Sequence, residues 1–143
     1  SKSQGTVLIQ TKNVNHSLNR RLQLDDDINY FDGELAQRKE FGYPPYVKLI
    51  KIKFRSRNKK ILYDGSNWFA NALKKNMKSK ILGPEFPIVS KIKNEFLMNL
   101  LIKVKPEDKL FSIKNIISKI LKKFNTYSQF RLIKTNVDVD PYN

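Results

Sequence analysis

The chain of 143 residues contains no cysteine, one histidine and no long apolar run. Without cysteine it can form no disulfide framework, no thiolate nucleophile and no cysteine-ligated zinc site. The single histidine, His16, cannot build a histidine-cluster metal site, and we interpret it as an ordinary surface residue. No segment reaches the roughly 18 consecutive apolar residues of a membrane-spanning helix. The sequence therefore predicts a cytoplasmic protein that binds no cofactor of its own.

The common catalytic motifs are also missing. The sequence has no glycine-rich GxxxxGK[ST] loop that would cradle phosphates, no HExxH zinc motif and no GxSxG nucleophile turn. Asp138 and Asp140 would share one face of a strand, which leaves metal binding open. We prefer to interpret this pair as a C-terminal anchor that contacts lysines. The sequence thus predicts no catalytic residue, no bound metal and no enzyme activity for this chain.

Acidic residues are scarce in the last two-thirds of the chain. Residues 1–45 carry six basic and six acidic side chains, whereas residues 46–143 carry 22 basic and seven acidic ones. The whole net charge of +15 therefore belongs to the second part. Such an asymmetry favours a polyanionic partner, nucleic acid first. It also indicates a domain boundary near Tyr43-Pro44-Pro45-Tyr46.

The first part predicts one strand and two helices. The sequence begins with neither a signal peptide nor an initiator methionine, so we expect a piece of a longer protein. A short apolar run predicts a strand over Thr6–Thr11, followed by a weak helix over Asn13–Leu24. Three aspartates then open a helix over Asp25–Phe41, because acidic residues favour a helix N-terminus. Its apolar face would consist of Ile28, Phe31, Leu35 and Phe41.

The second part alternates between strand and helix periodicity. Period-two patterns predict strands and 3.6-residue patterns predict helices. In order, we expect a strand at 46–57, a helix at 58–78, a break at Gly83-Pro84, strands at 87–96 and 97–105, a helix at 108–125 and a strand at 130–139. This order is the split βαββαβ, ferredoxin-like arrangement of the α+β class. Right-handed crossovers place both helices on one face of the sheet, so the other face has no cover.

Basic side chains are predicted to line that uncovered face. Phosphates attract such a surface through charge and counterion release, without contacts to bases. Tyr46, Phe54 and Phe96 fall on the core side or at strand ends, which favours backbone binding over base stacking. The alternative is a solvated face whose lysines only discourage aggregation. The candidate nucleic-acid-binding residues are Lys51, Lys53, Arg55, Lys91, Lys93, Lys103 and Lys105.

Four short motifs resemble those of primosomal protein N′, the PriA family of replication-restart helicases. A junction of the form E-x3-R followed by P-P-aromatic lies at Glu34–Tyr46. An L-G-P segment with a later K-I-K-N lies at Leu82–Asn94, and a terminal D-V-D-P at Asp138–Pro141. A G-x-V-x-x-Q-T strand motif lies at Gly5–Thr11. The order and spacing agree, so the resemblance covers essentially the whole chain.

The resemblance implies a C-terminal helicase fragment. Residues 1–24 would be the tail of the second helicase lobe, 25–45 a helical connector and 46–143 the C-terminal DNA- and partner-binding domain. The fold of that domain would be like that of a protein of the small ribosomal subunit. That domain would help bind forked or single-stranded DNA and the acidic tail of single-stranded DNA-binding protein. ATP, Mg and Zn would bind upstream regions of the parent family. Lys109 and Lys114, about 140° apart round the helix 108–125, are the candidate residues for the tail.

Two other functions remain open from the sequence. An RNA-binding or ribosomal-type module would suit the same fold and charge. A purely structural brace of the helicase lobes would carry solvated lysines and have negligible DNA affinity at moderate salt. Preference for forked DNA over duplex RNA in competition binding would separate the first alternative.

Overall fold

The computed structural model describes residues 5–16, 19 and 27–141. The chain divides into two compact units, Ser1–Glu40 and Phe41–Asn143, and each is described by itself. The assignment of residues 1–24 and 25–45 to a helicase lobe and a connector stays a prediction. Among the described residues, no helix has the length and apolar content needed to cross a membrane.

The predicted strand at Thr6–Thr11 is absent from the structure. Residues 5–11 have no regular secondary structure, and Val7 and Leu8 are 84% and 92% exposed. A strand needs a neighbour for its backbone N–H and C=O groups, and no described residue pairs with this segment. The predicted helix at 13–24 lies mostly outside the described residues.

The helix predicted from Asp25 is present as α2, which spans Asp27–Phe41. It ends at Gly42, whose φ of +63° is the left-handed conformation that stops a helix and that glycine adopts at low cost. The apolar residues that the sequence places on one face of α2 include Phe31 and Phe41, which are 60% and 61% exposed. The chain then turns through Tyr43, whose carbonyl accepts a hydrogen bond from the Tyr46 N–H at 3.0 Å.

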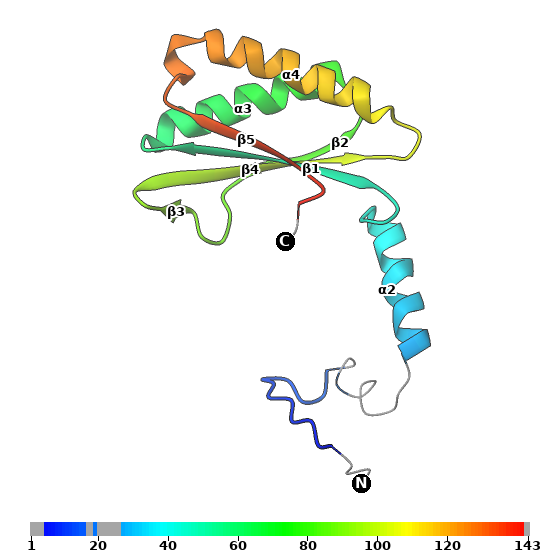
Figure 1. Cartoon of the computed structure of the whole chain (residues 1–143). Coiled ribbons are helices and arrows are strands. Elements are labelled where there is room, and N and C mark those ends of the chain that lie inside the picture. Colours follow the sequence, from blue (N-terminus) through cyan, green and yellow to red (C-terminus); the bar gives the residue numbers. More distant parts are fainter. Residues whose placement is uncertain (1–4, 17–18, 20–26, 142–143) are drawn as a thin grey trace. The chain divides into compact units, whose positions relative to one another are not determined.

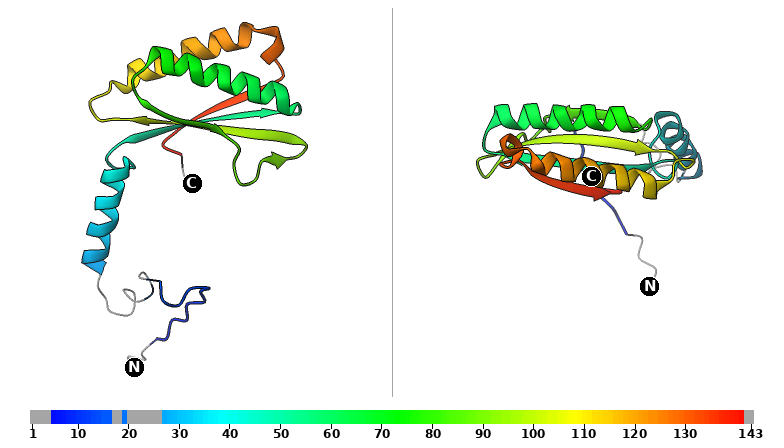
Figure 2. Two further views of the ribbon diagram at one scale, coloured as in Figure 1. Left: turned by 180° about the vertical axis from the view of Figure 1, so that it is seen from behind. Right: turned by 90° about the horizontal axis from the view of Figure 1, so that it is seen from above.

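The second unit has the predicted split βαββαβ fold (Figure 1). All strand pairs are antiparallel, and the sheet order is β2-β4-β1-β5, with the short β3 paired to β4. Helices α3 and α4 lie in one layer on one face of the sheet (Figures 1 and 2). The elements are β1 (Lys48–Ser56), α3 (Lys59–Asn76), β2 (Lys80–Glu85), β3 (Lys91–Ile92), β4 (Glu95–Val104), α4 (Leu110–Thr126), the short 3-10 helix η1 (Ser128–Phe130) and β5 (Lys134–Val139).

Strand β2 is the main correction to the sequence analysis. The predicted strand at 87–96 is wrong, because the second strand is β2 and it includes Gly83-Pro84, the expected break. An edge strand tolerates proline, since only one side of its backbone must pair. Gly83 has φ +87°, and a Cβ there would approach the Asn99 carbonyl oxygen to 2.8 Å. Glycine is therefore required where β2 passes β4.

The predicted start of the last strand is also wrong. Residues 128–130 form η1, and β5 begins only at Lys134. Phe130 and Ile133 are 5% and 6% exposed because they pack into the core rather than alternate along a strand. Phe130 and Ile133 are three residues apart, a spacing that does not place them on one face of a strand.

Aromatic side chains fill the space between helices and sheet. Phe54 of β1 meets Phe69 of α3 edge-to-face at 5.3 Å between ring centroids, and Phe124 stacks on Phe130 at 4.9 Å. Phe54, Phe69 and Phe124 are each 0% exposed. The predicted core face of β1 is thus confirmed, and the charged residues between these positions point to the other face.

Candidate nucleic-acid interface

The face of the sheet opposite the helices carries a row of basic residues. We call this the open face, and the basic residues of its β1–β5 part are Lys51, Lys53 and Arg55 of β1 and Lys134 of β5. In β1 these positions alternate with the buried Ile50, Ile52 and Phe54. Arg55 lies directly across from Lys134 in the β1–β5 ladder, and cross-strand partners share one face. The prediction that 51, 53 and 55 lie together on the uncovered side is confirmed geometrically.

A shallow depression lies among these side chains. Its volume is about 260 Å³, and its lining is polar or basic: Lys53, Arg55, Lys134, Thr135 and Asn136. Three cations, an amide and a hydroxyl are the groups with which proteins commonly contact phosphate oxygens. The depression therefore has the chemistry of a phosphate-binding surface.

Two carboxylates partly neutralise the open face. Asp138 lies 3.6 Å from Lys53 Nζ, and Glu95 lies 2.7 Å from Lys134 Nζ. The hydrogen bond from Lys134 holds the pKa of the Glu95 carboxyl below its ordinary value, helped by the charges of Lys134, Arg55 and Arg57 and opposed by desolvation. Both pairs are partly exposed to solvent, and ion pairs near the surface contribute little to stability.

Lys91 and Lys93 lie away from the open-face row, contrary to the prediction. Lys91 pairs with Phe96, which packs on the helix-covered side, and its Nζ lies 5.1 Å from the centre of that ring. Lys93 and Asn94 have φ of +47° and +62° and form the two-residue turn between β3 and β4. The hairpin consists of too few residues to continue the alternation of the main strands.

Lys103 is on the predicted face but is buried. It is 6% exposed, its Nζ donates a hydrogen bond to the Phe41 carbonyl at 2.7 Å, and the same atom lies 3.6 Å from the Tyr43 ring centre. A cation at the C-terminal end of a helix satisfies a carbonyl that has no partner within the helix. Lys103 is therefore occupied by Phe41 and Tyr43 and is not available to a partner molecule.

Lys105 is exposed at the end of β4 and pairs with Glu107 at 3.4 Å. The Glu107 pKa is lowered by a backbone hydrogen bond first, with Lys105 as a smaller cause. Asp108 accepts a hydrogen bond from the Lys105 N–H at 3.4 Å and lies in the turn before α4, which begins at Leu110 rather than at the predicted residue 108. Lys105 thus lies at the sheet end, beyond the central row.

Lys134 was missed as a site residue: it lies within the strand predicted at 130–139, but no register across the sheet was predicted for that strand. The strand register identifies Lys134 as part of the open face: in the β1–β5 ladder, Arg55 pairs with Lys134 and Lys53 pairs with Asn136. The predicted D-V-D-P anchor has two roles. Asp138 contacts Lys53, as expected, whereas the Asp140 carboxylate accepts a hydrogen bond from the Leu49 N–H at 3.1 Å. Within the described ranges, no three metal-ligating side chains form a cluster.

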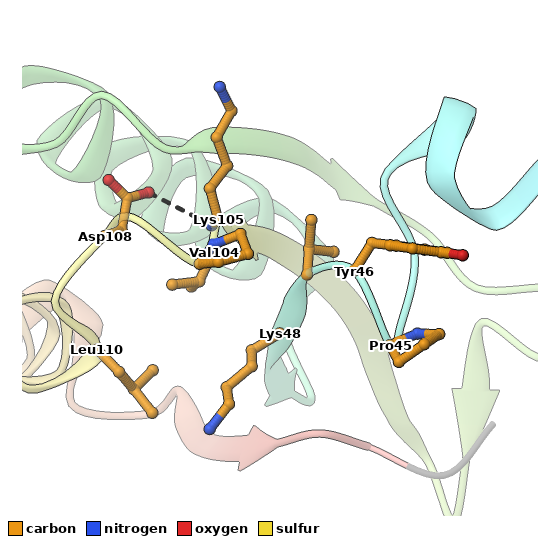
Figure 3. Close-up of a pocket in the computed structure, with 9 residues that line it drawn as sticks. Pro45, Tyr46, Lys48, Val104, Lys105, Asp108 and Leu110 are labelled. Carbon is orange, nitrogen blue, oxygen red and sulfur yellow. Dashed lines mark hydrogen bonds between the residues drawn. The ribbon is translucent and has the colours of Figure 1, made fainter.

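A pocket lies where β1 begins and β4 ends (Figure 3). Its volume is about 280 Å³. Lys48 and Lys105 are its cations, and Asp108 is its one carboxylate. Lys109 follows directly as the residue before α4, while Lys114 is exposed on that helix. The apolar wall consists of Pro45, Tyr46, Val47, Val104, Pro106 and Leu110.

The antiparallel sheet with two helices on one face and a basic row on the other defines a small α+β module. A designed protein, Foldit4, has a similar fold, with a TM-score of 0.51 and 12% identity over 68% of this chain and 99% of that one. The model of the primosomal protein N C-terminal domain matches residues 39–142. The chain therefore belongs to the primosomal protein N C-terminal domain family, part of a replication restart protein.

Relatives with curated descriptions agree with this family. Replication restart protein PriA of Bacillus subtilis is 27% identical over 140 residues, which is 96% of this chain and 17% of that protein. PriA of Thermotoga maritima is 34% identical over 70% of this chain and 13% of that protein. PriA of Treponema pallidum is 31% identical over 69% of this chain and 15% of that protein. The chain thus spans less than a fifth of the length of these relatives.

Proposed function

We propose that this chain is a non-catalytic module of a replication-restart DNA helicase that holds the phosphate backbone of branched DNA in the cytoplasm. The observation that supports this function most is a group of four basic residues on one uncovered sheet face, Lys51, Lys53, Arg55 and Lys134. The last three of these line a polar depression. No aromatic ring lies in that row, so the surface is suited to phosphates rather than to stacked bases.

Binding to a forked DNA of defined sequence, measured across a salt series, tests this function. Affinity should fall linearly on a log–log plot with a slope of about −0.9 per phosphate contact. The variant K51Q/K53Q/R55Q/K134Q should bind weakly and show a shallower slope. A matched control, K78Q/K91Q/K93Q/R131Q, loses the same charge elsewhere and should bind much better.

The outcomes separate the alternatives. Equal loss in both variants would mean that net charge alone matters, and unchanged affinity in the open-face variant would exclude this face. Tighter binding to duplex RNA than to the fork would favour the RNA-binding module. Negligible DNA affinity of the unaltered chain at moderate salt would favour the structural brace. Turnover of ATP by the purified chain would contradict the non-catalytic role.

We further propose that the module takes part in capturing the acidic, apolar-ended tail of single-stranded DNA-binding protein. The pocket beside Lys48 and Lys105 offers apolar walls with cations at its rim, and Lys109 and Lys114 extend the positive charge along α4. Cationic clusters commonly capture acidic peptide motifs. A labelled tail peptide should show saturable binding at low salt and lose affinity in Lys114→Glu. No saturable binding, or no effect of the charge reversal, would exclude this assignment.

A further inference from the structure

The outer surface of the helix layer is a second basic surface. Helices α3 and α4 carry eight exposed lysines and a single carboxylate, Asp64 of α3. Each helix buries one apolar stripe against the sheet, so these side chains point away from the core. The eight are Lys59, Lys60, Lys74, Lys75, Lys114, Lys119, Lys122 and Lys123.

The charge of this layer is not compensated. The ion pairs found in the described part of the chain use Lys53, Lys105 and Lys134, which lie on or beside the sheet, and none uses a lysine of α3 or α4. Lys119 and Lys123 are four residues apart on α4, a spacing at which like charges destabilise a helix. Ion pairs within the fold therefore do not account for this pattern, whereas a surface of this charge is complementary to an anionic partner.

The outermost positions combine lysines with amides. Lys60, Asn71 and Lys75 lie on the side of α3 opposite its buried Leu62, Phe69 and Leu73, as the 3.6-residue period requires.

The same period places Asn115, Lys119 and Lys122 opposite the buried stripe of α4. The two helices lie side by side above the sheet (Figure 2, right). Lysine and asparagine side chains are both common donors to phosphate oxygens. The layer thus presents donors from two adjacent helices to one partner.

We propose that this helix-layer surface, defined by Lys60, Asn71, Lys75, Asn115, Lys119 and Lys122, binds a second nucleic-acid backbone. The helix layer and the open face lie on opposite sides of the sheet, so one copy of the chain would bridge two nucleic-acid segments. Bridging rests on the proposed function of the open face, whereas binding at the helix layer does not.

A bridging assay with the whole chain tests the proposal. A duplex is fixed to beads, protein is added, and capture of a second, fluorescent duplex is measured at low salt. The variant K60Q/K75Q/K119Q/K122Q should still bind the fixed duplex through the open face. Its capture of the second duplex should fall about tenfold or more, because several phosphate contacts are lost. Circular dichroism should show an unchanged fold, since these side chains are exposed.

Two further arms keep the two proposals apart. K51Q/K53Q/R55Q/K134Q should also lose bridging and should keep only a weakened binding to the fixed duplex, through the helix layer. The variant that combines all eight substitutions should lose both binding and bridging. If the helix-layer variant bridged as well as the unaltered chain, the inference would be overturned. Bridging by a dimer through two open faces would give this result. If instead the open-face variant kept full bridging and the helix-layer variant lost it, the proposed function of the open face would be wrong. Binding at the helix-layer surface would then be supported.

Discussion

At the scale of residues, two lysines on the same sheet face have opposite surroundings. Lys51 is half-buried in the middle of β1, and no ion pair within the described residues uses it. Lys103 is buried against Phe41 and Tyr43. The same alternation in the sequence places both on the open face, but only the three-dimensional junction after α2 shows that Lys103 is already occupied. The period-two alternation of a strand predicts the sheet face on which a residue lies, but not which residues its side chain contacts.

The pair Lys103→Met and Lys51→Met tests this difference. Lys103→Met should lower the free energy of unfolding by about 1.5–3 kcal/mol, because a charged donor to a carbonyl is lost. Lys51→Met should change it by no more than about 0.5 kcal/mol, as is usual for surface substitutions. Urea unfolding measures both. For DNA affinity the order should reverse: Lys51→Met should lose more affinity than Lys103→Met. Equal losses of affinity in two folded variants would contradict a structural role for Lys103.

Glu95 competes with phosphate for Lys134. Glu95→Gln should therefore tighten DNA binding and steepen the salt slope by about 0.9, the value for one added phosphate contact. Fluorescence anisotropy across the salt series measures both. Asn94→Asp adds a carboxylate next to Glu95 and serves as the control, because it should weaken DNA binding. Unchanged affinity in Glu95→Gln would mean that Lys134 does not meet phosphate.

The same pair predicts a pH dependence. The folded-state pKa of Glu95 lies below its ordinary value, so the pair stabilises the fold above the ordinary carboxyl pKa. This contribution is lost as the pH falls through the lowered folded-state pKa. Lys134→Gln should move the Glu95 pKa back toward the ordinary range, as observed by NMR of the carboxyl carbon. A pKa unaffected by that substitution would contradict the assignment of Lys134 as its main cause.

At the scale of elements, the long periodic segments were predictable and the short ones were not. β1, α3, β4 and α4 each extend over enough residues for their periods to be clear. β2 escaped prediction because it contains Gly83 and Pro84, which normally end a strand. The family motifs lie mostly at junctions: Gly42 ends α2, Gly83 passes close to β4, and Lys93-Asn94 forms a hairpin turn. These motifs identify the fold, whereas the basic row of the open face follows only from the register between β1 and β5.

Gly65 in α3 is required by packing. By helix propensity alone, Gly65→Ala would stabilise α3 by roughly 1 kcal/mol. A Cβ at this position would instead collide with the buried Ile133 and crowd Phe124 and Phe130. Gly65→Ala should therefore lower the free energy of unfolding by about 1–3 kcal/mol, the usual range for overpacking. The exposed Asn71→Ala in the same helix is the control and should be neutral or stabilising. Urea unfolding decides, and a stabilised Gly65→Ala would contradict this packing.

At the scale of the whole molecule, the charge asymmetry of the sequence becomes a two-sided basic domain. The sequence showed that residues 46–143 hold the net charge and that the sheet has an uncovered face. It could not show which lysines are neutralised, because Asp138 and Glu95 reach Lys53 and Lys134 only after the strands have paired. The lysines of α3 and α4, in contrast, form no ion pair within the described residues.

The central claim, that the open face holds a nucleic-acid backbone, is tested most directly by NMR. Amide signals of the isotope-labelled chain are followed while a short forked DNA is added at low salt. The account predicts early shifts at residues 51–55 and 134–136, which lie side by side in the β1–β5 ladder, and their reversal by added salt. Saturable DNA binding with unchanged signals in both of these segments would contradict it.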